Sequence, residues 1–134
     1  MKSSVTEFTE KPLSPRDDWN ERIDHILEAI AAIESDVEGL TRGAFMQDEL
    51  RQRAVLWSFQ VIGEAIRALP EDFRDRYPDV QWRAIRGLRN VIVHQYEGVD
   101  FEQIWETITE RLPRLREQML VVREDIAQDE TGNP

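Results

Sequence analysis

Apolar residues recur at steps of three and four positions along most of this 134-residue chain, and this spacing constrains the fold more than any other feature. Such steps place residues on one side of an α-helix, whereas a half-buried strand alternates apolar and polar residues. Neither that alternation nor an Asn-Gly hairpin signal occurs in the sequence. We therefore expect an all-α fold. The clearest stripe consists of Phe101, Ile104, Ile108, Leu112, Leu115, Met119, Val122 and Ile126.

Capping and helix-breaking residues divide this pattern into separate helices. Ser14 followed by Pro15 is typical of a helix start, while Gly39 and Gly43 mark the end of the first stripe. Pro70 ends the second helix, because proline lacks the backbone N–H that a helix interior needs. The predicted helices span 14–40, 48–69, a short turn at 70–77, 80–96 and 101–126, with a kink at Pro113.

These helices are expected to form one domain, an up-and-down four-helix bundle with a short extra helix, because the short loops make neighbours antiparallel. The bundle spans 14–124, between a flexible N-terminal arm at 1–13 and an acidic C-terminal tail at 125–134. No apolar run is long enough for a membrane span and no signal-peptide pattern is present, so we expect a cytoplasmic protein. The second helix is expected to turn inward Leu50, Ala54, Trp57, Val61, Ala65 and Ile66.

Composition excludes several classes of function. The absence of cysteine rules out a disulfide scaffold, a thiolate metal site and a cysteine nucleophile. Only two histidines, His25 and His94, leave little room for an all-histidine metal centre. The 27 acidic and 17 basic residues give a net charge of −10, which opposes nonspecific binding to nucleic acid or to an anionic membrane.

One window departs from this acidic background. The stretch 81–96, QWRAIRGLRNVIVHQY, contains Arg83, Arg86, Arg89 and His94 but no carboxylate. The planar guanidinium of arginine suits bidentate recognition of phosphate. Three arginines on one helix are equally consistent with an ordinary solvated face, so charge alone leaves the window open to both interpretations.

Arginine and histidine together favour metal-free cleavage of a phosphodiester. Imidazole exchanges a proton near neutral pH, guanidinium stabilises a pentavalent phosphorane, and RNA supplies its own nucleophile, the 2′-hydroxyl. Arg89 and His94 are five residues apart, about 140° around a regular helix and ~7.5 Å along it, so they converge only if the helix unwinds or two copies meet. A second copy would also supply the second imidazole. The simpler alternative is a histidine that caps a helix C-terminus.

The sequence from Arg89 to Tyr96, RNVIVHQY, reads R-x4-H-x-Y and resembles the motif of HepT toxins, ribonucleases of the HEPN superfamily. VIGEAIRALP, YPDVQWRAIRGLRN and FEQIWETITERLPRL extend the resemblance over roughly 16–120. It implies a HEPN-like helical homodimer with clefts at the subunit interface, metal-independent RNA cleavage without a cofactor, and a minimal nucleotidyltransferase as antitoxin partner. Arg89 would bind the phosphate, His94 would be the general acid or base, and Tyr96 would be the tyrosine modified with AMP.

Other residues have both functional and structural interpretations. Asn90 is a candidate helper beside Arg89, and Glu64 either orients Arg89 through an ion pair or is an exposed carboxylate on a helix flank. Arg83 and Arg86 guide RNA phosphates or form salt bridges. His25 fits a surface histidine better than a metal ligand. Trp57, Trp82 and Trp105 are expected in the core or at an interface rather than stacked on bases.

Two alternative functions remain open at this stage. One is a non-catalytic helical subunit that binds a nucleotidyltransferase and is modified by it, since amphipathic helices suit such docking. The other is a DNA-binding repressor, which requires a basic recognition helix placed in the major groove. Long acidic helices disfavour the repressor, so no DNA partner is expected.

Overall fold

The structure is a computed structural model that describes residues 14–86 and 98–132. Its elements are helices, with no strand among these residues, in agreement with the all-α prediction. They are α2 (Pro15–Val37), α3 (Arg42–Met46), α4 (Glu49–Ala68), α5 (Glu71–Asp75), a helical turn at 82–86, α7 (Phe101–Glu106), the π-helical η2 (Thr107–Arg111) and α8 (Leu112–Gly132).

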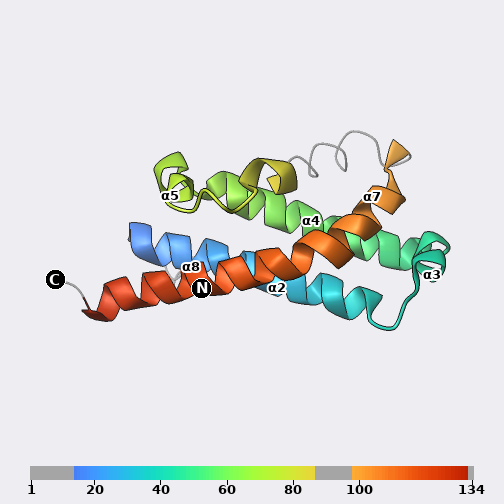
Figure 1. Ribbon diagram of the computed structural model, residues 1–134, viewed down its shortest axis with the longest axis horizontal. Coiled ribbons are helices and arrows are strands. Elements are labelled where there is room, and N and C mark those ends of the chain that lie inside the picture. Colours follow the sequence, from blue (N-terminus) through green and yellow to red (C-terminus); the bar gives the residue numbers. More distant parts are fainter. Residues whose placement is uncertain (1–13, 87–97, 133–134) are drawn as a thin grey trace, which may run out of the picture.

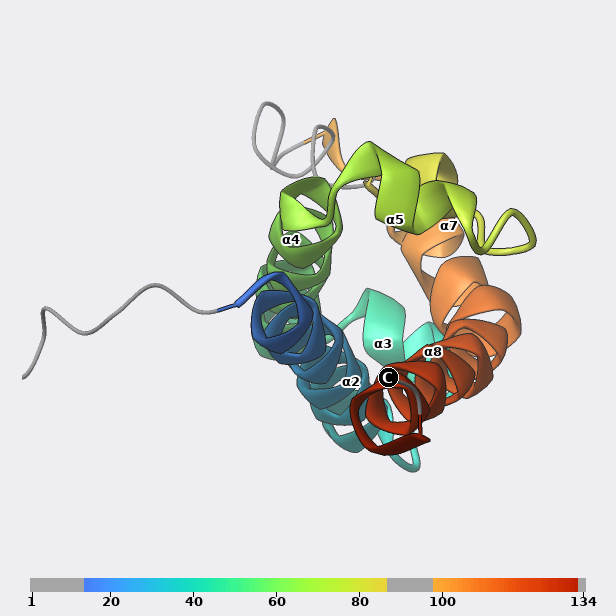
Figure 2. The same cartoon turned by 90° about the vertical axis from the view of Figure 1, so that its left-hand side faces the viewer.

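Helix α2 lies between α4 and α8 and packs against both, while α5 and α7 lie across the bundle from α2 (Figure 1 and Figure 2). Viewed from the end, the helices surround a common core (Figure 2). Buried aliphatic and aromatic side chains from all of them form one continuous cluster. The described residues therefore form an all-α helical bundle, as the sequence predicted.

The first long helix begins and ends where its sequence predicts. Ser14 Oγ accepts a hydrogen bond of 3.1 Å from the Asp17 amide, which satisfies one of the free N–H groups of the first turn. After the helix, Gly39 adopts a φ of 78°, a left-handed conformation that glycine reaches without a steric penalty. The buried side of α2 consists of Ile23, Ile26, Ala29, Ile30 and Ile33.

The predicted inward face of α4 was wrong at two of its six positions. Leu50 is 76% exposed and Trp57 is 67% exposed, while Ala65 and Ile66 are buried as predicted. The helix carries apolar residues around most of its circumference, so its sequence offered two stripes. Packing against α2 selects the stripe with the larger number of bulky side chains. The side that is buried consists of Gln52, Val55, Leu56, Ser58, Phe59, Ile62, Gly63, Ala65 and Ile66.

The short helix α3 was not predicted, because its five residues are too few for a stripe and Gly43 indicated a loop. Thr41 Oγ1 caps it by accepting from the Ala44 amide at 3.1 Å. Phe45 is fully buried, with its ring centroid 5.2 Å from that of Trp105, and Gln52 Nε2 donates to the Phe45 carbonyl at 3.0 Å. These contacts anchor α3 between α4 and α7.

The C-terminal helix is continuous through α7, η2 and α8, and it is irregular immediately before Pro113. There the Leu112 amide donates to the Thr107 carbonyl, five residues back, in a π-helical turn. Pro113 has no N–H to offer the preceding turn, which explains why the irregularity predicted at this proline occurs here. Helix α8 continues to Gly132, so helical structure extends into the range 125–134 that the sequence analysis assigned to a tail. The predicted stripe is buried at Ile104, Ile108, Leu112, Leu115, Met119, Val122 and Ile126.

Candidate functional site

The motif residues Arg89, Asn90, His94 and Tyr96 lie outside the described residues. The structure describes the two segments that lead into the motif and out of it. The candidate site is therefore described through these two segments, the contacts that anchor them, and the side chains of α4 and α5.

The segment that leads into the motif is the helical turn at 82–86, and hydrogen bonds hold this turn against the α5 region. Trp82 is buried, and its indole Nε1 donates to the carbonyls of Arg74 and Tyr77, each at 3.2 Å. Ile85 is also buried. Of the two locations predicted for Trp82, the core is therefore confirmed. This turn presents its polar side to solvent at a fixed place next to α5.

Arg83 is exposed and Arg86 is half-buried on this polar side. Together with Arg74 they line a hollow of about 250 Å³. Glu71 and Asp75 border the same hollow, but no carboxylate among the described residues comes within ion-pair distance of Arg83 or Arg86. The salt bridges considered as the alternative for these two arginines are absent from the described part of the chain.

The exit from the motif is held by the start of α7. Val99 is buried, and the Asp100 carboxylate accepts from the amides of Glu102 and Gln103 at 3.1 and 3.2 Å. This N-cap fixes where the chain re-enters the bundle. Both flanks of the motif are thus attached to the core, and eleven residues, 87–97, separate them.

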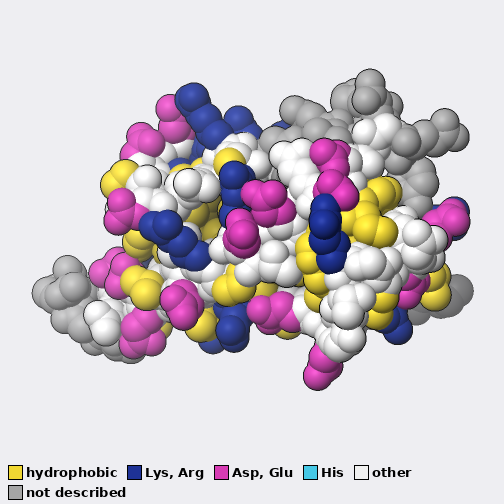
Figure 3. All heavy atoms as spheres, turned by 45° about the vertical axis from the view of Figure 1, so that its right-hand side comes forward, with side chains coloured by type: hydrophobic (Ala, Val, Ile, Leu, Met, Phe, Trp, Pro, Cys, Tyr) yellow, Lys and Arg dark blue, Asp and Glu magenta, His cyan; other side chains and the backbone are white. Residues whose placement is uncertain are grey.

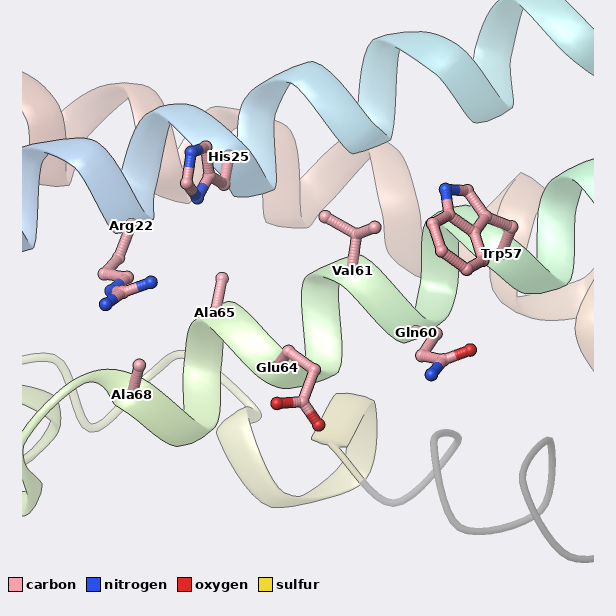
Figure 4. Close-up of a pocket in the computed structure, with 8 residues that line it drawn as sticks. All are labelled: Arg22, His25, Trp57, Gln60, Val61, Glu64, Ala65 and Ala68. Carbon is pink, nitrogen blue, oxygen red and sulfur yellow. The ribbon is translucent and has the colours of Figure 1, made fainter. Parts of the chain in front are cut away.

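A second hollow, of about 420 Å³, lies between α2 and α4 (Figure 4). Arg22 and His25 come from α2, and Val61 and Ala65 of α4 point toward them, while Glu64 lies on the side of α4 turned away from α2. His25 Nε2 is 3.9 Å from a Glu21 carboxylate oxygen. The histidine is therefore a partly exposed residue on a helix flank.

Glu64 is 47% exposed at its side chain and stands 3.7 Å from an Arg67 guanidinium nitrogen. Such an exposed pair contributes less than about 1 kcal/mol to folding. Its predicted role in orienting Arg89 concerns a partner outside the described residues. Trp57, which borders the same hollow, is exposed, so of its two predicted locations the core is wrong and an interface remains.

One tyrosine in the described region has a shifted pKa. Burial, followed by a hydrogen bond of 3.1 Å to Asp125 Oδ2, raises the pKa of Tyr77 to about 12. The neutral phenol therefore persists at physiological pH and links the α5 region to α8. This tyrosine has a structural role and is distinct from the motif residue Tyr96.

Sequence reasoning missed Arg111 and Arg114, which line a hollow of about 180 Å³ next to the 82–86 turn. They belong to a run rich in both arginine and glutamate, where residue type gives no sign of which cations are paired. Only the packing of α8 against the segment before Trp82 brings them beside the motif's entry.

An all-helical bundle with arginine-bearing elements at the entry to an R-x4-H-x-Y segment is the architecture expected of a HEPN-type ribonuclease. A family model described as "Ribonuclease HepT-like" matches residues 26–122, most of the bundle. The chain belongs to the HepT-like ribonuclease family.

Three relatives support this assignment. A protein named "Putative RNase TTE0752" from Caldanaerobacter subterraneus is 36% identical over 97 residues, 72% of this chain and 87% of its own length. "Putative RNase MJ0127" from Methanocaldococcus jannaschii is 33% identical over 119 residues, covering 88% of this chain and 98% of its own. "Probable ribonuclease HepT" from Thermococcus cleftensis is 34% identical, covering 70% and 86% respectively.

No solved structure matches this chain. None of the helices in the described residues combines the length and the apolar character that crossing a membrane requires.

Proposed function

We propose that this protein is a metal-independent endoribonuclease toxin of a toxin–antitoxin system. The observation that carries the proposal is the R-x4-H-x-Y motif, from Arg89 to Tyr96, inside a carboxylate-free arginine window of a HepT-like family member. Fixed anchors on both sides of the motif support it, since catalytic side chains need a rigid scaffold to position them.

The chemistry follows from the residues that the motif supplies. One His94 imidazole removes the proton of the RNA 2′-hydroxyl, whose oxygen attacks the adjacent phosphorus. Arg89 stabilises the charge on the pentavalent phosphorane, with the Asn90 amide beside it. The bond from phosphorus to the 5′-oxygen then breaks, and a second imidazole protonates the departing oxygen. The products are a 2′,3′-cyclic phosphate and a free 5′-hydroxyl, with no change in oxidation state.

The second imidazole comes from a second copy of the chain, because each chain has only one histidine in its motif. The exposed apolar stripe of α4, formed by Leu50, Trp57 and the partly exposed Val61, is the surface that we assign to this contact. A two-fold axis would pair the stripe with itself and bring two arginine windows to one cleft.

A nucleotidyltransferase antitoxin is the proposed control. It would transfer an adenylyl group from ATP to the Tyr96 phenolic oxygen, releasing pyrophosphate and the phenol proton. The added phosphate places negative charge and bulk where the RNA phosphate must bind, which opposes substrate binding. The same partner is the basis of the alternative function, in which the chain is only its non-catalytic binding subunit.

The test compares RNA cleavage by the wild-type protein and by His94→Ala, with divalent metal chelated throughout. We expect the wild type to produce 2′,3′-cyclic phosphate ends and the variant to lose at least about 100-fold in rate, the usual contribution of a general acid or base. Equal melting temperatures verify that the variant is folded. Equal cleavage by both proteins removes His94 from catalysis, and no cleavage by the wild type favours the non-catalytic subunit.

A further inference from the structure

The arginines of the described residues fall into two groups according to whether a carboxylate faces them. One group forms ion pairs within 4.0 Å: Arg22, Arg42, Arg51, Arg53, Arg67, Arg116 and Arg123. In the other group, no described carboxylate pairs with Arg16, Arg74, Arg76, Arg83, Arg86, Arg111 or Arg114. Acidic and basic side chains are interspersed on the surface (Figure 3), so the lack of pairing reflects position and not a shortage of acids.

Except for Arg16, the unpaired arginines lie on three adjoining parts of the fold: α5 with its C-cap residue, the 82–86 turn, and the junction of η2 with α8. Two hollows flank the 82–86 turn. Arg83 and Arg86 line one of them, while Ile85 borders the other together with Arg111 and Arg114. We call the four residues Arg83, Arg86, Arg111 and Arg114 the arginine band.

The platform under the arginine band is held in place by direct hydrogen bonds. Gln118 Nε2 of α8 donates to the Asp79 carbonyl at 3.1 Å, just before the 82–86 turn. On the other side, the Trp82 indole is bonded to the carbonyls that end α5. The cations are therefore presented by fixed elements, which lowers the entropy lost when a ligand binds.

Unpaired guanidinium groups on neighbouring elements repel one another, and a bound polyanion removes that cost. Asp79 and Glu110 border the hollow of Arg111 and Arg114, so its two carboxylates balance its two guanidinium groups in formal charge. We therefore expect it to add phosphate contacts to a strand that is also held elsewhere. It is not expected to bind nucleic acid alone.

We propose that Arg111 and Arg114 bind phosphates of the RNA strand away from the scissile bond, and that the strand crosses the 82–86 turn to reach them. The arginine band thereby extends the surface assigned to Arg83 and Arg86 onto η2 and α8. This inference rests on the proposed ribonuclease function and adds the path of the substrate.

The test compares two double variants that remove equal charge from the same C-terminal helix. Arg111→Gln/Arg114→Gln removes unpaired cations, and Arg116→Gln/Arg123→Gln removes cations paired with Glu34 and Asp24. The probe is a fluorescent 2′-O-methyl oligoribonucleotide of about 12 nucleotides, which cannot be cleaved through a 2′-hydroxyl. Affinity is measured between about 50 and 200 mM salt.

We expect the Arg111/Arg114 variant to bind about tenfold more weakly at the lower salt, and the slope of log K against log salt to fall by about 1.4, or 0.7 per phosphate contact. The Arg116/Arg123 variant should bind like the wild type. Melting temperatures of all three proteins verify that they are folded.

Equal binding by the wild type and the Arg111/Arg114 variant overturns the inference. Equal weakening in both variants also overturns it, because net charge alone then explains the effect. A third outcome is that the Arg111/Arg114 variant binds RNA like the wild type but no longer binds a nucleotidyltransferase antitoxin. That result would assign the band to a protein partner and overturn the RNA path.

Cleavage of an unmodified dinucleotide, too short to extend from the motif to Arg111 and Arg114, separates this inference from the proposed function. Here we expect the Arg111/Arg114 variant to match the wild type. If neither protein cleaves RNA but the difference in oligonucleotide affinity persists, the binding path stands and the nuclease proposal fails.

Discussion

Single side chains fix the segment that leads into the motif. The indole of the buried Trp82 and the hydroxyl of the partly buried Tyr77 both donate hydrogen bonds, one to α5 and the other to α8. A buried polar group without a partner costs about 1–3 kcal/mol, so each bond also ties two elements together. The sequence predicted that Trp82 is buried, but it could not predict these acceptors, because they come from segments that only the fold brings near.

At the residue scale, we predict that Tyr77 makes the free energy of unfolding depend on pH in the alkaline range. Its folded pKa of about 12 exceeds the ordinary value of 10.0, so the folded state holds its proton more tightly. The stabilisation is complete below pH 10 and is lost as the pH rises toward 12. Wild-type melting temperature should therefore fall across that interval.

Tyr77→Phe supplies the comparison, since it retains the ring and removes the titrating hydroxyl. We expect the variant to be about 1 kcal/mol less stable at neutral pH, through loss of the bond to Asp125, and to show a flatter decline at high pH. Parallel melting curves for both proteins across the alkaline range would contradict this account.

At the scale of elements, the boundaries of α2 and α4 were predictable and the buried face of α4 was not. The ends of α2 are set by local capping and backbone conformation at Ser14, Pro15 and Gly39. Residues adjacent in the sequence determine both effects. Leu50 and Trp57 belong to a helix with two apolar stripes, and only the partner helices decide which one is buried. Short helix α3 was missed because its stability comes from Phe45 packing and not from its own five residues.

The two glycines that the sequence assigned to the end of the first helix should respond oppositely to alanine. Gly39→Ala should destabilise the fold by about 1 kcal/mol, because the φ of 78° at Gly39 is a left-handed conformation that alanine adopts only with strain. A steric clash is not the cause, since no atom lies within 4 Å of an added Cβ. Gly43→Ala should stabilise it by about 0.5–1 kcal/mol, since Gly43 is helical within α3 and its added Cβ also meets no atom within 4 Å. Denaturant unfolding of both variants measures the difference, and changes of the same sign would refute it.

At the scale of the whole molecule, the spacing of apolar residues was enough to predict a helical bundle. The residues of the candidate site were predictable only in part. Arg89 and His94 were accessible through the motif and the family resemblance, since both are encoded in a short continuous stretch. Arg111 and Arg114 were not, because their relation to the 82–86 turn depends on how α8 crosses it. The contact proposed for Trp57 depends on a second copy of the chain, so the packing of a single chain does not determine it.

The exposure of Trp57 has a consequence for the proposed dimer. A side chain that is 67% exposed in the single chain contributes little to its folding, but it would be buried if two α4 stripes met. Trp57→Glu should therefore leave the melting of the isolated chain nearly unchanged and prevent association, because two facing carboxylates would be desolvated without partners.

Leu120→Glu is the matched control, since Leu120 is 42% exposed and lies on α8, outside the proposed contact. Sedimentation at about micromolar concentration should give a dimer mass for the wild type and Leu120→Glu and a monomer mass for Trp57→Glu, as expected for loss of a central aromatic anchor. RNA cleavage per chain should fall at least tenfold only in the monomer, because each chain then lacks the second imidazole. A dimeric and fully active Trp57→Glu would place the two-fold contact on another face, and a monomeric but fully active one would show that a single chain supplies both proton transfers.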